Sequence, residues 1–81
     1  MQIEDTYKAA YLMTRGARLV DITFRKVGTT KGLYRKQWIC HLEDVPEGAI
    51  NNWNFNQAVV NVADFRRERL RIKKLAKSKF V

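Results

Sequence analysis

The spacing of the hydrophobic residues changes along this chain, and that change limits its fold more than any other feature. Apolar side chains recur at helical spacing near both ends, whereas between residues 19 and 43 they alternate with polar ones. The first pattern is typical of amphipathic helices and the second of half-buried strands. A chain of 81 residues has room for one domain. The sequence therefore predicts a single α+β domain, residues 1–81, with helices on one face of a two- or three-stranded antiparallel sheet.

The first helix is expected near the start of the chain. Asp5 or Thr6 can cap its amino terminus, and the helical pattern continues to about Arg15. Gly16 follows, where a helix end favours a residue in the left-handed conformation. We therefore expect the chain to turn at Gly16.

A hairpin is expected next. Residues 19–27 and 33–43 alternate in polarity, and the five residues between them begin and end with glycine. Val20, Ile22 and Phe24 then share one face of the first strand. This face is expected to lie on the core.

Two further helices are expected after the hairpin. Asp44 is predicted to cap a short helix with Pro46 in its first turn, and the asparagine-rich residues 51–56 end it. Residues 58–60 form either a short third strand or an extended link. Asn61 is predicted to cap the last helix. The expected element order is α-β-β-α-α.

The last helix carries most of the excess charge. Residues 64–81 hold eight of the sixteen basic residues and two of the eight acids, within a chain of net charge +8. A basic helix on a compact domain is typical of proteins that bind a polyanion. We therefore predict a non-enzymatic protein that binds DNA or RNA through phosphates, with weak sequence preference. The predicted contacts are Arg66, Arg67, Arg71, Lys73, Lys74 and Lys77 of the helix, with Arg25, Lys31 and Arg35 of the hairpin.

Other interpretations of the same residues stay open. The basic helix could instead bind an acidic surface of a host protein, or be a solvated face that keeps the protein in solution. Basic residues on the hairpin could block pairing between sheet edges. Trp53 and Phe55 could stack on bases, although large aromatic residues near a helix end are more often core anchors.

The residues that carry catalysis or bind metals are sparse. Cys40 and His41 are the only cysteine and histidine, and neighbours on a strand point to opposite faces. No disulfide and no cysteine-based zinc site can form within one chain. We expect no catalytic residues, no metal and no cofactor. We also expect no signal peptide and no membrane span, and thus an intracellular, cytoplasmic protein.

Parts of the chain resemble a family of small uncharacterised proteins of phages and mobile elements. The similar stretches are AAYLMTRG at residues 9–16, LVDI at residues 19–22 and the start of the last helix at residues 61–67. The resemblance implies a helix that ends at glycine, a hairpin, a closing basic helix and a viral or mobile-element origin. It implies no site residues, because the family's function is not established. The small size, the hairpin edge and Leu70, which interrupts the basic arc, add the expectation of a homodimer.

Overall fold

The computed structural model describes residues 1–28, 32 and 34–80. Its elements, in chain order, are β1 (Gln2–Ile3), α1 (Thr6–Thr14), β2 (Arg18–Gly28), β3 (Tyr34–Glu43), α2 (Glu47–Asn54) and α3 (Val62–Phe80). The three strands form one antiparallel sheet in the order β1-β3-β2. The α+β prediction is therefore confirmed, with β1 as an element that the sequence analysis did not foresee.

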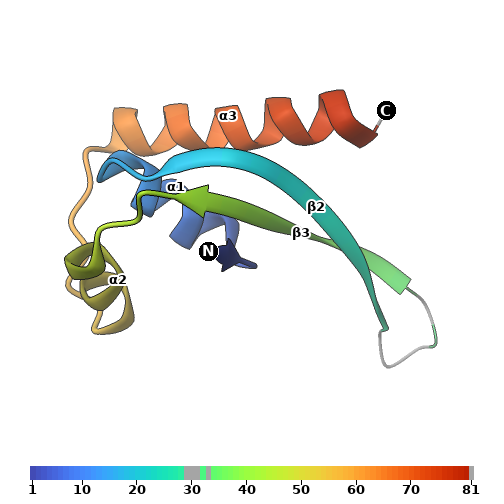
Figure 1. The fold of residues 1–81 in the computed structure, drawn as a ribbon, viewed down its shortest axis with the longest axis horizontal. Helices are drawn as coiled ribbons and strands as arrows, with labels where there is room; N and C mark the ends of the chain where they lie inside the picture. The colour runs from blue at the N-terminus through green and yellow to red at the C-terminus, as the bar shows by residue number, and fades with distance from the viewer. Residues whose placement is uncertain (29–31, 33, 81) are drawn as a thin grey trace.

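The helices surround one end of a long hairpin. Figure 1 shows α1 crossing behind β2 and β3, α3 running along the β2 side, and the far end of the hairpin curving away from the helices. The core lies where α1, α3 and the sheet meet. Ile22, Cys40 and Leu42 of the sheet are fully buried there, with Ile72 and Ala76 of α3. The half of the hairpin nearest the helices thus provides the fully buried residues that the sheet contributes to the core.

Both ends of α1 follow from its sequence. The Asp5 carboxylate accepts hydrogen bonds from the backbone N–H groups of Tyr7 and Lys8, at 2.9 and 3.3 Å. Gly16 has φ +108°, and the N–H of Ala17 donates to the carbonyl of Leu12 at 3.0 Å. These bonds form a Schellman motif, which satisfies the last carbonyls of the helix. The predicted cap and the predicted turn are both confirmed.

A register shift changes one face of β2. Leu19 pairs with Leu42 and Asp21 pairs with His41, so Val20 has no partner of its own between them. Val20 is 47% exposed. The expectation that it shares the core face of the strand is wrong, because an extra residue at this point reverses the alternation.

Of the two alternatives for residues 58–60, the short third strand is ruled out, because these residues lie outside any strand. The third strand is β1, which pairs with β3 and places Ile3 opposite Cys40. The expectation for the start of α2 is wrong. Asp44 does not cap α2, since it has φ 56° and the helix begins at Glu47, after Pro46. Pro46 is extended there and provides no side-chain cap.

Candidate nucleic-acid interface

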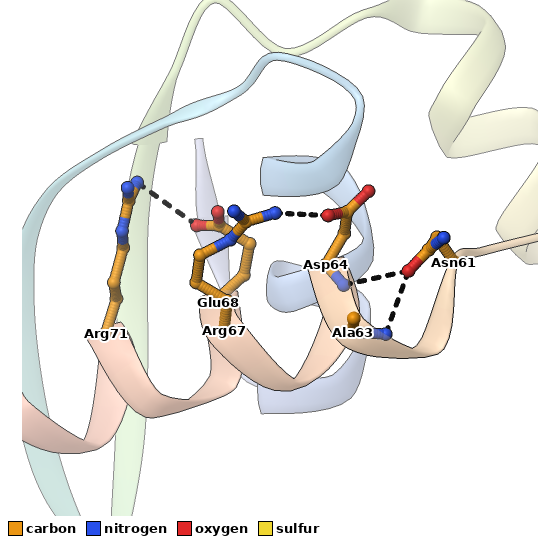
Figure 2. A network of polar contacts seen from close by, with 6 residues as sticks. All are labelled: Asn61, Ala63, Asp64, Arg67, Glu68 and Arg71. Atoms are coloured by element: carbon orange, nitrogen blue, oxygen red, sulfur yellow. Dashed lines mark hydrogen bonds and ion pairs between the residues drawn. The ribbon is translucent and has the colours of Figure 1, made fainter.

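Helix α3 buries one side and exposes the other. Ile72 and Ala76 are 1% exposed, and Phe65 and Leu75 pack against the same core. The Asn61 side chain caps the helix by accepting from two backbone N–H groups, as predicted (Figure 2). The predicted basic arc therefore lies on a well-anchored helix and faces solvent.

Four basic residues on this exposed side have no acidic partner. At 100° per residue, Arg66, Lys73 and Lys77 fall within about 40° of one another, and Lys74 lies about 60° further round the helix. All four are exposed. None forms an ion pair with any residue that the structure describes. We call Arg66, Lys73, Lys74 and Lys77 the cation ridge.

The other two predicted arginines of α3 are paired. Arg67 contacts the Asp64 carboxylate, and a guanidinium nitrogen of Arg71 lies 3.4 Å from a carboxylate oxygen of Glu68 (Figure 2). Each acid precedes its arginine by three residues, a spacing that places both on the same side of a helix. The arginine side chains are still 61% and 65% exposed. They remain accessible to a ligand, but an ion pair must be broken first.

An apolar residue lies within the basic surface. Leu70 is 55% exposed, and shallow depressions flank it, one lined by Arg66, Arg69 and Lys73. The Arg69 guanidinium lies 4.4 Å from the ring centre of Tyr7. Arg69 is thus held against α1 and is not a member of the cation ridge.

The far half of the hairpin is a second basic region. We call residues 24–28 and 34–38 the arm. Arg35 is exposed and has no ion-pair partner in the described ranges, whereas Arg25 lies 2.6 Å from a carboxylate oxygen of Glu4. Lys31, the remaining predicted contact, lies outside the described residues. The arm also carries Lys26 and Lys36, both exposed, which the predicted set omitted.

The far end of the hairpin curves away from α3, as Figure 1 shows. Near the carboxyl end of α3, Lys79 contacts the Asp21 carboxylate of β2. The hydrogen bond from Lys79, helped by the Ile22 N–H, lowers the pKa of Asp21. This contact links the end of the helix to the sheet near the core, and the arm lies further along the same hairpin.

Cys40 and His41 do not act together. Cys40 is buried in the core, and burial raises the pKa of its thiol to about 11. The His41 ring lies on the opposite face, 2.8 Å from the Thr23 hydroxyl. Within residues 1–28, 32 and 34–80, no group of three His, Cys, Asp or Glu side chains is placed to hold a metal.

The aromatic residues after α2 have different surroundings. Trp53 is half-buried, with its ring centre 5.6 Å from that of Tyr11, which identifies it as a core anchor. Phe55 is 71% exposed. Stacking on bases is therefore unfavourable for Trp53, whose ring already packs within the fold.

No protein-family model, no curated protein and no solved structure matches this chain. In the described part of the chain, no helix combines the length and apolar character needed to cross a membrane.

Proposed function

We propose that this is a non-enzymatic nucleic-acid-binding protein that grips phosphates with α3. The cation ridge carries the proposal, since it offers four exposed cations on one anchored helix with no acid to neutralise them in the described structure. Each cation that contacts a phosphate releases condensed counterions, which favours binding. Arg67 and Arg71 add to this phosphate-binding surface when their ion pairs with Asp64 and Glu68 break. Three of the four ridge residues are lysines, which act as point charges on phosphates, so weak sequence preference follows.

Purified protein titrated with labelled duplex and single-stranded oligonucleotides over a salt series tests the proposal. On duplex DNA, the four ridge contacts alone contribute about −3.6 to the slope of the logarithm of the binding constant against the logarithm of the salt concentration. The absence of any retarded complex at low salt would rule the function out.

A second candidate is an adaptor or inhibitor that docks on an acidic surface of a host protein. Leu70 favours it, because an exposed apolar side chain ringed by arginine and lysine is typical of protein interfaces. A viral or mobile-element origin, suggested by the resemblance, would suit this role. A pull-down from nuclease-treated lysate separates the two functions, since a protein partner survives nuclease and a nucleic-acid bridge does not.

A homodimer remains part of the proposal, on a surface other than the ridge. Two copies joined through α3 would bring their ridges together and repel each other. The exposed apolar residues between α2 and α3, Phe55 at 71% and Val59 at 76%, offer a less charged contact. Measuring the protein's mass in solution at two salt concentrations tests for the dimer.

A further inference from the structure

The arm has too little packing around it to be a purely structural hairpin. The sheet residues with full burial end at Ile22 and Cys40, and the next pair toward the far end is Phe24 and Trp38. Phe24 is 39% exposed and Trp38 is half-buried. Beyond them the exposed residues of the arm are mainly basic. The arm therefore extends past the core and presents cations to its surroundings.

Two lysines face each other across the arm. Lys26 and Lys36 are directly opposed partners in the β2–β3 register, and neither has an acidic partner in the described structure. Like charges opposite each other on one face of a sheet destabilise it. The Lys36 ammonium lies 4.9 Å from the ring centre of Phe24, so the ring partly offsets this cost. Both strands of the arm are edge strands, because β1 pairs with β3 only at Cys40 and His41. Edge blocking accounts for a charge on each strand, but it does not require the two charges to be directly opposed.

The cations of the arm occupy both of its faces. Lys26 and Lys36 follow the parity of Ile22 and Cys40, on the core side of the sheet. Arg35 is opposite Val27, on the other side. A ribbon that lies flat on a phosphate backbone needs cations on one face only. Cations on both faces suit a ribbon with phosphates on either side.

The dimensions of the arm suit one kind of groove. Sheets pack about 10 Å apart face to face, so a two-stranded ribbon with side chains on both faces is on the order of 10 Å thick. The major groove of B-form DNA, about 12 Å wide and 8.5 Å deep, accepts such a ribbon, whereas the minor groove at about 6 Å does not. The major groove of A-form RNA is too narrow for side chains to read. Five residues per strand give about 15 Å of reach, more than the groove depth.

We infer that the ligand is duplex DNA and that the arm enters its major groove, with Lys26 and Lys36 meeting the phosphates of one wall and Arg35 those of the other. This inference rests on the proposed function and names its nucleic acid. The ridge then contacts backbone outside the groove and supplies affinity for any polyanion. The arm supplies the preference for B-form DNA over A-form RNA.

The test compares the full-length protein with Lys26→Gln/Lys36→Gln on DNA and RNA duplexes of the same sequence. Two lost phosphate contacts lower the salt slope on DNA by about 1.8, with little change on RNA. Lys8→Gln/Arg18→Gln is the charge control: it removes two charges at sites away from the arm and the ridge, one of them the Arg18 guanidinium that pairs with Glu43, and should retain the preference for DNA. Lys26→Glu is a second arm variant. It places a carboxylate opposite Lys36, which should raise the melting temperature, and it puts a negative charge where the proposal places a phosphate, which should weaken DNA binding.

Methylation of guanine N7 by dimethyl sulfate reports the groove, because N7 lies in the major groove. Wild-type protein should protect N7, and Lys26→Gln/Lys36→Gln should not. Full N7 accessibility in the wild-type complex, equal binding to both duplexes, or an arm variant that binds like the control would each overturn the inference while leaving the proposed function intact. Failure of wild-type protein to bind any nucleic acid, including the case where it binds only an acidic protein, overturns both.

Discussion

Binding to DNA should depend on which cations of α3 are removed, and not only on how many. Arg66→Gln/Lys73→Gln removes two members of the cation ridge. Arg67→Gln/Arg71→Gln removes the two arginines that Asp64 and Glu68 already engage. Both variants lower the net charge from +8 to +6. Any difference between them therefore comes from the surroundings of the removed charges.

The expected magnitude follows from counterion release. Each phosphate contact on duplex DNA contributes about 0.9 to the salt slope, so the loss of two ridge contacts changes the slope by about 1.8. If the variant and the wild-type protein bind equally at 1 M salt, the variant binds about 60-fold more weakly at 0.1 M salt. A paired arginine must leave its carboxylate before it reaches a phosphate, and an exposed ion pair is worth about 0.2–1 kcal/mol. Breaking both pairs costs about 0.4–2 kcal/mol, or about 2- to 30-fold in affinity, so the loss for the paired arginines should be smaller than about 60-fold by that factor at the same salt concentration.

Fluorescence anisotropy with a labelled duplex, between roughly 50 and 300 mM salt, measures both slopes. Thermal melting of each variant first establishes that α3 is still folded. If the two variants lose affinity equally, with equal slopes, net charge alone drives binding and the distinction between ridge and paired arginines is refuted.

Three further predictions concern the fold. Asn61→Ala removes the cap of α3 and should lower the free energy of unfolding by about 1 kcal/mol, measured by urea denaturation; no change would mean that water replaces the cap. Gly16→Ala forces a Cβ into a left-handed conformation at φ +108° and should destabilise by about 1 kcal/mol, by the same measurement; a more stable variant would contradict the strain. Burial raises the pKa of the Cys40 thiol from 9.0 to about 11. Between these pH values the thiol ionises in the unfolded protein but stays protonated in the folded one, so the free energy of unfolding should fall as the pH rises. Cys40→Ala should show a shallower fall, and an unchanged profile would contradict the raised pKa.

Local signals in the sequence were enough to predict both ends of α1, the start of α3 and the hairpin, although not the start of α2. Asp5, Gly16 and Asn61 act through bonds to residues next to them in the chain, so their roles are visible without tertiary structure. The strand β1 is different, since two residues carry no periodicity and pair with β3 only after the chain has folded. The exposure of Val20 likewise depends on a register that alternation alone cannot give.

In the candidate site, too, some features were visible from local sequence and others appear only in the strand pairing. The basic arc of α3 was visible from helical spacing, and the acids three residues before Arg67 and Arg71 could have identified those two as paired. The direct opposition of Lys26 and Lys36 was not predicted, because alternation alone does not fix the register of two strands. Their opposition appears only in the β2–β3 pairing.

Most acidic side chains of this domain already have a local role. Among the described residues, six of the eight acids form ion pairs with arginine or lysine: Glu4, Asp21, Glu43, Asp44, Asp64 and Glu68. A seventh, Asp5, caps α1. Few carboxylates are left to shield the ridge from other macromolecules. During purification the protein should consequently carry cellular polyanions through the first column, visible as a raised ratio of absorbance at 260 to 280 nm (roughly the nucleic-acid and aromatic maxima) that a high-salt wash lowers.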